Sequence, residues 1–391
     1  MAGNRPPLWI HLGAGQIGIG VILPFLATVP QSKVRLVIIS RLGDRAPDQP
    51  QRETQLGDDD IKKRREWLGR SSIVCPIEVF ENPRQTRRLT FPMILAEQRS
   101  NLESAVREGS RAFIYTDVRL SEMKEVLAEA DFISTSLGEG GLAELYQFWK
   151  AIGPGSKATK LYLFENRYGS FVNEDTYLAS ETLPNAANVI PVVVDRLAIQ
   201  AHDDYAIEHG SARLAPVRVE EHWSLSSTEK PGFVDGLESA SNWEKIKQED
   251  FRFLHKRKRY MVNALHTALA LLGYARLRGM GLDGNRQAFP LVVESVLTDG
   301  DNFRLLDVFA RAQAFMLLLE SSWTDRMAVA PEIFTFQNLI DYAFGAIERF
   351  RQFPDELGRV LADSPDKRRR RFDEQIKPLE KFLAKAENED R

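Results

Sequence analysis

The N-terminal half of the chain alternates short apolar runs with stretches of helical periodicity. Residues 8–12 form an apolar run that stops at a glycine-rich turn, and apolar side chains then recur at helical spacing to about residue 30. Residues 34–39 form a second run, rich in β-branched side chains, which is typical of a buried parallel strand. This order of strand, glycine turn, helix and strand predicts the start of a βαβ unit.

The alternation continues to about residue 165 and then gives way to helices. Strands are expected at 112–116, 132–137 and 161–164, and helices at 120–130 and 142–152. Long amphipathic helices are expected at 256–272, 303–321, 333–350 and 368–387. Residues 43–110 are interpreted as an insertion with possible strands at 72–80 and 90–96. The pattern predicts an α/β fold, with a Rossmann-like doubly wound sheet in 1–215 and a mostly α-helical domain in 216–391.

Composition narrows the class of protein. A chain of 391 residues is long enough for two domains, and 52 Lys and Arg against 55 Asp and Glu give a net charge of −3, which argues against a nucleic-acid binder. The single cysteine, Cys75, allows neither an internal disulfide nor a cysteine-based zinc site, so no metal site is expected. We expect no membrane partner, because no apolar stretch approaches the length of a membrane span. The N-terminus does not resemble a signal peptide, so a cytoplasmic protein is expected.

The glycine turn has the spacing G-x-G-x-x-G in Gly13, Gly15 and Gly18. Between a strand and a helix, this spacing predicts a dinucleotide site, with glycines for the tight turn, for close approach of the pyrophosphate and for helix–strand packing. The helix N-terminus supplies unpaired N–H groups to the anion. Further candidate cofactor residues lie in the same turn and at the end of the strand at 132–137: Gln16, Ile17, Ser136 and Gly138.

The end of the second strand bears on which dinucleotide is bound. An NAD site usually has an acidic residue there, but this chain has none before Asp44 and has Ser40 and Arg41 instead. Because a hydroxyl and a guanidinium suit a 2′-phosphate, NADP is favoured. NAD, or use of both cofactors, remains open, because Arg41 could be a solvated loop arginine.

The helix expected at 256–272 carries Lys258, Asn263 and His266 in the pattern K-x4-N-x2-H. At about 100° per residue, His266 lies roughly 80° and Asn263 roughly 140° from Lys258, so all three can line one broad face. A deprotonated lysine and amide donors beside a nicotinamide would suffice to oxidise an alcohol without a metal.

Taken together, four segments resemble the mannitol dehydrogenase family of polyol-specific long-chain dehydrogenases. These are the glycine fingerprint 13–18, Glu-Asn at 165–166, Val-Asp-Arg at 194–196 and the helix at 258–273. The resemblance covers about residues 1–275 except 43–110, and the chain length is nearer to the sugar-phosphate members.

The resemblance implies a role for each matched residue. Lys258 would be the general base in oxidation and the general acid in reduction, and Asn166 and Asn263 would hydrogen-bond the reacting oxygen. His266 would position substrate hydroxyls, and Asp195 would lie near Lys258. The family works without zinc, in keeping with the single cysteine.

Each of these residues also has a structural interpretation. Lys258 lies in a basic stretch that could be a solvated helix face, and Asn166 could cap the following helix. Asn263 could make a structural hydrogen bond, His266 could be a core histidine, and Asp195 could form an ion pair with Arg196.

The expected function is metal-independent hydride transfer between NADP or NAD and a secondary alcohol or ketone of a polyol or sugar phosphate. A sugar-acid reductase (acting on a uronate or aldonate) and a non-catalytic NAD(P)-sensing protein are the alternatives. The expected partner is a small polyol or sugar substrate, and the expected state is a monomer or small homo-oligomer.

Overall fold

A computed structural model describes the chain in segments. They are residues 5–41, 72–82, 85–97, 111–116, 123–152, 159–165, 168–173, 178–183, 186–196, 198–200, 206–208, 211–213, 217–235, 241–279, 296–321, 329, 331–352 and 365–389. The chain forms two compact units, Met1–Glu81 with Thr86–Ile246 (unit 1) and Asn82–Gln85 with Lys247–Arg391 (unit 2).

The centre of unit 1 is a parallel sheet whose strand order defines the fold. Its strands are β1 (Leu8–Leu12), β2 (Arg35–Arg41), β5 (Arg111–Thr116), β6 (Phe132–Thr135), β7 (Lys160–Leu163) and β8 (Val189–Asp195). They lie in the order β5-β2-β1-β6-β7-β8, and each neighbouring pair is parallel. Counted along the chain without the insertion, this is the Rossmann order 3-2-1-4-5-6, so the predicted fold class is confirmed. The chain order reverses between β1 and β6, which is the switch point where such sheets bind ligands.

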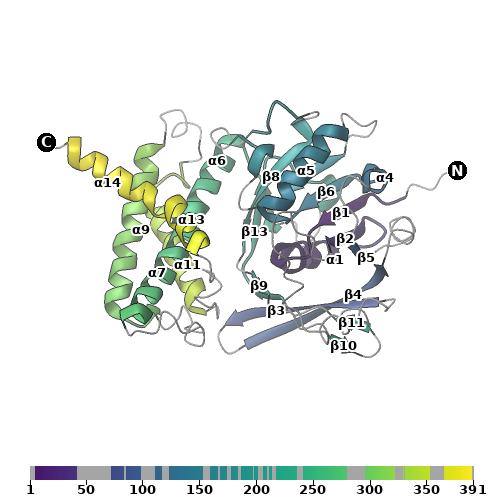
Figure 1. Ribbon diagram of the computed structural model, residues 1–391, viewed down its shortest axis with the longest axis horizontal. Coiled ribbons are helices and arrows are strands. Elements are labelled where there is room, and N and C mark those ends of the chain that lie inside the picture. Colours follow the sequence, from purple (N-terminus) through teal and green to yellow (C-terminus); the bar gives the residue numbers. More distant parts are fainter. Residues whose placement is uncertain are drawn as a thin grey trace. The chain divides into compact units, whose positions relative to one another are not determined.

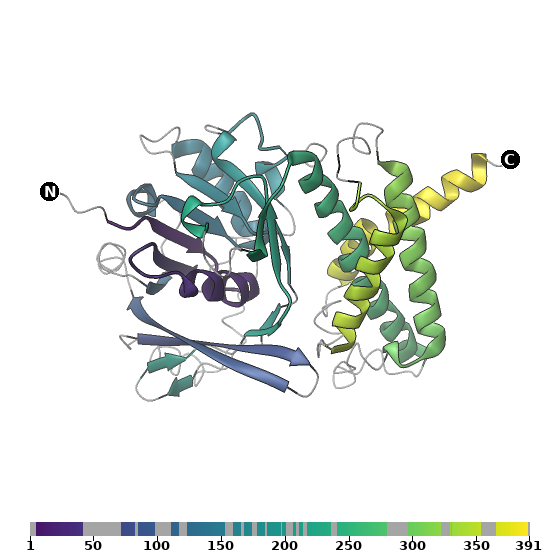
Figure 2. The same cartoon turned by 180° about the vertical axis from the view of Figure 1, so that it is seen from behind.

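The insertion extends this sheet instead of forming a separate body. β3 (Ser72–Asn82) and β4 (Gln85–Glu97) confirm both strands expected there, and β4 pairs in parallel with β5. β3 pairs in parallel with β11 (Ser211–Arg213) and β12 (Val217–Glu220). The short strands β9 (Ala198–Gln200) and β10 (Ala206–Glu208) pair with β12 and β11. Figure 2 shows the long strands β3 and β4 beside the short β10 and β11.

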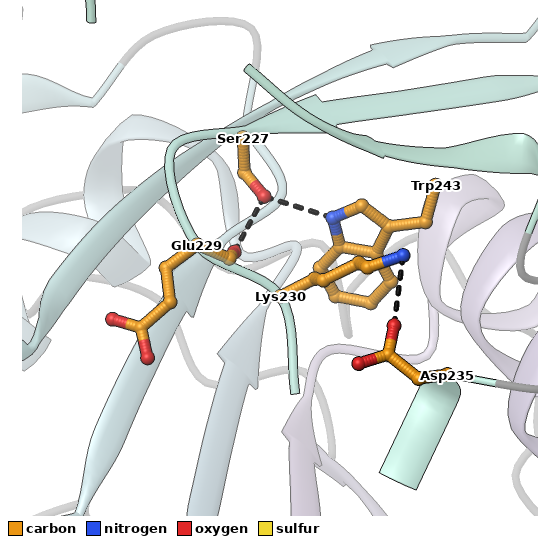
Figure 3. Close-up of polar contacts among 5 residues, drawn as sticks. All are labelled: Ser227, Glu229, Lys230, Asp235 and Trp243. Atoms are coloured by element: carbon orange, nitrogen blue, oxygen red, sulfur yellow. Dashed lines mark hydrogen bonds and ion pairs between the residues drawn. The ribbon is translucent and has the colours of Figure 1, made fainter. Parts of the chain in front are cut away.

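Unit 1 continues past the expected boundary at 215/216. β13 (Ser224–Ser227) is antiparallel to β8, and β14 (Trp243–Lys245) is parallel to β13. Nε1 of Trp243 donates to Oγ of Ser227 at 2.8 Å, and that hydroxyl donates to the carbonyl of Glu229 at 2.6 Å (Figure 3). The Trp243 ring is 1% exposed and contacts Trp9 of β1. This tryptophan packs into the core of the sheet, and unit 1 includes the chain up to Ile246.

The helices of unit 1 lie between its strands in sequence. They are the π-helical turn η1 (Gly18–Ile22), α1 (Leu23–Thr28), α4 (Lys124–Ala128), α5 (Gly138–Ile152) and the 3₁₀ turns η4 (Gly169–Phe171), η5 (Ala186–Asn188) and η6 (Gly232–Val234). The η1–α1 segment packs Ile19, Ile22 and Phe25 into the same core as Trp9.

From Gln248 onward, the described elements of unit 2 are helices, as predicted (Figure 1). Its helices are α6 (Gln248–Arg257), the π-helical turn η8 (Lys258–Asn263), α7 (Ala264–Gly279), α9 (Gly300–Glu320), α11 (Phe336–Gln352), α13 (Pro365–Gln375) and α14 (Lys377–Glu389). The side chain of Asp299 caps α9 by accepting from the amides of Asp301 and Asn302. Within the described segments, no helix combines the length and apolar character that crossing a membrane requires.

Candidate functional site

The glycine turn lies at the carboxyl end of β1, beside the switch point. Gly13 has φ +109°, a conformation that favours glycine, and its amide donates to the carbonyl of Ile39 in β2 at 2.9 Å. Gln16 and Ile17 open the helix, and the amide of Ile19 donates to the carbonyl of Gly15 at 3.0 Å. The chain therefore turns sharply from the strand into a helix whose first amides lack helical partners, which is an anion-binding geometry.

Gly18 is needed for packing inside this turn. A Cβ at this position would overlap the carbonyl oxygen of Gly13 and lie 2.7 Å from Nε2 of His11. At Gly15, in contrast, a Cβ would meet no atom within 4 Å. The turn thus has no room for a side chain at Gly18 and has open space next to Gly15, as a pyrophosphate-binding turn requires.

A buried hydrogen-bond chain supports the turn from β1 and β6. Nε1 of Trp9 donates to Oγ of Ser134 at 2.6 Å, and Nδ1 of His11 lies 2.7 Å from the same hydroxyl. Nε2 of His11 lies 3.0 Å from Oγ of Ser136, which donates to the carbonyl of Gly13 at 3.2 Å. We call these four side chains, together with the Gly13 carbonyl, the His11 relay.

The two ends of the His11 relay set its direction. The indole N–H of Trp9 can only donate and the carbonyl of Gly13 can only accept. Because Ser136 gives its single hydroxyl proton to Gly13, Nε2 of His11 must donate to Ser136, and Nδ1 of the neutral ring then accepts from Ser134. Burial lowers the pKa of His11 to about 3, although a hydrogen bond to Gly13 opposes the effect, so the ring is neutral.

The turn between β6 and α5 is held by hydrogen bonds to the Glu165 side chain. Gly138 has φ +70°, and Oε1 and Oε2 of Glu165 accept from the amides of Leu137 at 2.6 Å and Gly138 at 3.2 Å. Burial raises the pKa of Glu165 to about 7, and bonds from these amides and from Thr135 oppose the rise. The two glycine-containing turns that flank the switch point are therefore both fixed by polar side chains.

Sequence reasoning gave His11 no role and did not assign Glu165 or Ser136 a supporting role. His11 is a polar residue inside an apolar strand and Glu165 directly follows one, and both patterns were visible signals. Ser136, predicted to bind cofactor, directs its hydroxyl into the His11 relay. Gly138 lies in the turn beside it, and the cofactor roles of both residues stay predictions.

Ser40 and Arg41 end β2, next to the glycine turn. They pair in register with Tyr115 and Thr116 of β5, and Ser40 is partly buried. The side chain of Arg41 lies outside the described part of the chain. The preference for NADP stays a prediction.

The residues of the K-x4-N-x2-H pattern lie in η8 and α7 of unit 2, where the winding differs from the expected helix. Lys258 to Asn263 form a π-helical turn, and the amide of Ala264 donates to the carbonyl of Arg259, five residues earlier. A turn closed by such a bond holds more residues than an α-helical turn, so Asn263 lies nearer to Lys258 around the helix axis than the roughly 140° expected for an α-helix. Single π-helical turns of this kind are frequent at functional sites.

The other predicted catalytic residues, His266, Asp195 and Asn166, lie in different parts of the chain. The His266 ring is 8% exposed and stacks on Phe350 of α11, with ring centroids 4.6 Å apart. Asp195 ends β8 in unit 1, whereas Lys258 belongs to unit 2, so their expected proximity stays a prediction. Asn166 lies outside the described residues.

Arg196 links two distant segments of unit 1 through hydrogen bonds. Its Nη1 donates to the carbonyl of Gly20 in the η1 turn at 2.7 Å, and its Nε donates to the carbonyl of Glu220 at 3.1 Å. These bonds give Arg196 a structural role.

In the described part of the chain, no group of three or more His, Cys, Asp and Glu side chains could hold a metal ion.

Comparisons with known proteins found likenesses at the level of structure alone. No family model and no curated protein sequence matches the chain. A D-sorbitol dehydrogenase in substrate-free form is 15% identical, with 93% of this chain and 74% of that chain covered and a TM-score of 0.48. A 2-dehydropantoate 2-reductase from Porphyromonas gingivalis W83 is 13% identical, covering 95% and 99%, with a TM-score of 0.38. A D-mandelate dehydrogenase with NADH and anilino(oxo)acetate is 11% identical, covering 96% and 99%, with a TM-score of 0.41. The fold assignment follows from the strand order itself.

Proposed function

We propose that this chain is an oxidoreductase that transfers a hydride between NADP or NAD and a secondary alcohol or ketone of a polyol or sugar phosphate. The observation that carries the proposal is the glycine turn next to the switch point of a 3-2-1-4-5-6 sheet, with no room for a side chain at Gly18 and open space next to Gly15. The residues fit a dinucleotide, because helix amides after Gly15 are available to a pyrophosphate and Ser40 and Arg41 end the neighbouring strand.

The proposed chemistry uses side chains of the η8–α7 helix. When bound, the cofactor supplies the hydride acceptor or donor. Lys258 would take the hydroxyl proton at its Nζ during oxidation and return it during reduction, and the Asn263 amide would hold the reacting oxygen. The π-helical turn supports this division of roles, because Asn263 is nearer to Lys258 around the helix axis than in an α-helix. These roles follow the resemblance to the mannitol dehydrogenase family.

The test follows reduction of NAD and NADP separately, through the absorbance of the reduced cofactor. The panel is mannitol, mannitol 1-phosphate, arabinitol, sorbitol and gluconate, with the corresponding keto compounds in the reverse direction. Lys258→Ala should lower turnover by about 10²–10⁴-fold or more while cofactor binding persists. Lys256→Ala, in the same basic stretch, is the matched control and should keep its activity.

The outcomes separate the candidate functions. Turnover of gluconate or its keto partner alone would favour the sugar-acid reductase. Cofactor binding without turnover of any compound would favour the sensing protein. Full activity of Lys258→Ala would contradict the proposed mechanism.

A further inference from the structure

Glu165 has a place at the switch point that the proposed function does not yet use. The chain leaves β7 at Leu163, the amide of Phe164 donates to the carbonyl of Thr135 at 3.1 Å, and Glu165 follows. The carboxylate thus lies at the carboxyl edge of the sheet, where the glycine turn also lies. It comes from the strand next to β6 and holds the turn that follows β6.

The hydrogen bonds of Glu165 favour a carboxylate. Its two oxygens accept from the successive amides of Leu137 and Gly138. A glutamine has only one acceptor oxygen, so its NH₂ group would face one of these amide donors. The amide of Gly138 also belongs to the first turn of α5, where a negative charge is favoured by the helix dipole.

Among the described residues, the groups that hydrogen-bond to Glu165 and act on its pKa are uncharged. The hydrogen-bonding groups that act on its pKa are the uncharged Thr135 hydroxyl and the two amides. On β1, His11 is neutral, because burial lowers its pKa to about 3. The other acidic residues on elements beside it are Asp195 at the end of β8 and Glu139 and Glu144 in α5. Since burial raises the pKa of Glu165 to about 7, the carboxylate gains and loses its proton near neutrality.

Resting on the proposed function, we propose that Glu165 is a positioning residue for the nicotinamide end of the cofactor, and that its negative charge favours the oxidised form over the reduced form. The reason is chemical. The oxidised nicotinamide ring carries a positive charge and the reduced ring does not, so only the oxidised form gains from a nearby carboxylate in a partly buried site.

This proposal has a defined pH dependence. A bound positive ring lowers the pKa of Glu165, so binding of the oxidised form near pH 7 releases a proton. Affinity for the oxidised form rises as the pH passes upward through 7, whereas affinity for the reduced form changes less. If the ring lowers the pKa by about one unit, the ratio of the two affinities changes by about tenfold across the titration. The 2′-phosphate of NADP is common to both forms, so its own titration cancels in the ratio.

The experiment measures dissociation constants of NADP⁺ and NADPH by calorimetric titration from pH 6 to pH 8 (about one unit on either side of neutrality). Two buffers of different ionisation enthalpy report the protons released. The variants are Glu165→Gln, which removes the charge, and Glu165→Asp, which keeps it. Glu125→Gln removes an exposed carboxylate from α4 of the same unit and is the control.

We expect the affinity ratio to change with pH in the unmodified protein, Glu165→Asp and Glu125→Gln, and to stay constant in Glu165→Gln. Binding of both forms with a constant ratio in the unmodified protein would overturn the role of Glu165 alone. A ratio that changes equally in Glu165→Gln would do the same. Failure of the unmodified protein to bind either form of NADP, and then either form of NAD in the same titration, would instead overturn the proposed function. Should Glu165→Gln not fold, a constant ratio or absent proton release in Glu165→Asp would overturn the role.

Discussion

Nε2 of His11 lies 3.0 Å from Oγ of Ser136, and this contact joins β1 to the turn after β6 across the switch point of the sheet. The same histidine limits what can stand at Gly18, because a Cβ there would lie 2.7 Å from Nε2. The glycine fingerprint of this chain is therefore shaped by a buried polar chain as well as by the needs of a phosphate.

Gly18→Ala and Gly15→Ala should separate packing from binding. The first forces a Cβ against the Gly13 carbonyl and His11, so we expect a loss of about 1–3 kcal/mol of stability together with cofactor affinity. The second meets no protein atom within 4 Å, so the unfolding midpoint should hardly change while cofactor affinity falls. Urea unfolding and cofactor titration of both variants check this. Equal destabilisation by the two variants would contradict the packing argument.

His11 should make the protein less stable in acid. Its pKa is lowered to about 3 in the folded protein from an ordinary value of 6.5, so below pH 6.5 the unfolded chain binds a proton that the folded protein does not. Stability is present above pH 6.5 and is lost by up to about 1.4 kcal/mol per pH unit as the pH falls towards 3. In His11→Asn, which does not titrate, this slope should be absent although the variant is less stable overall. Urea unfolding at several pH values measures it, and an unchanged slope would exclude His11 as the source.

Glu165 should have the opposite effect. Its pKa is raised to about 7 in the folded protein from an ordinary value of 4.5. Its contribution to the free energy of unfolding is therefore fully present below pH 4.5 and is lost as the pH rises to 7. Relative to the unmodified protein, Glu165→Gln should gain up to about 3 kcal/mol between these two pH values. The difference is read from paired unfolding curves of the protein without cofactor. A constant difference across this range would contradict the raised pKa.

Arg41→Ala should change cofactor preference. Arg41 ends β2, where NAD sites usually have a carboxylate. If its guanidinium binds a 2′-phosphate, its removal should weaken NADP by about tenfold or more and leave NAD nearly unchanged. Separate titrations with the two cofactors measure this. Equal effects on both cofactors would mean that Arg41 does not select between them.

Cys75 should report global unfolding. It is fully buried in β3, and burial raises the pKa of its thiol, so little reactive thiolate is present in the folded protein. A thiol reagent should modify it at least about 100-fold more slowly in the folded than in the urea-unfolded chain. Fast modification under native conditions would show that β3 opens locally.

The period of the hydrophobic pattern was enough to predict the main elements, because buried parallel strands and amphipathic helices leave strong local signals. β1, β6 and β7 lie within a few residues of their expected positions, and so do α9 and α11. The pairing of β3 and β4 with the main sheet could not be predicted, because it depends on contacts between residues far apart in sequence. Unit 1 also includes the chain up to Ile246, where the burial of Trp243 against Trp9 has no local signature.

Some residues of the candidate site could likewise be predicted from the sequence, and others could not. Gly13, Gly15 and Gly18 were recognisable because backbone geometry demands glycine at fixed spacing. The His11 relay was not, because its partners Ser134 and Ser136 come from another strand. The relative position of Asn263 was also beyond the sequence, because nothing in the apolar pattern distinguishes a π-helical turn from an α-helical one.

The wide turn at Lys258–Asn263 has one more residue than an α-helical turn would hold. Deleting one residue there would restore ordinary winding without shortening the apolar face of α7. Because the wide turn closes after five residues where an α-helical turn closes after four, the helix on either side of the deletion would keep nearly the same orientation about its axis. The extra residue therefore lengthens the sequence between Lys258 and Asn263 without turning α6 against α7, so this spacing can change while the direction of the helix is kept.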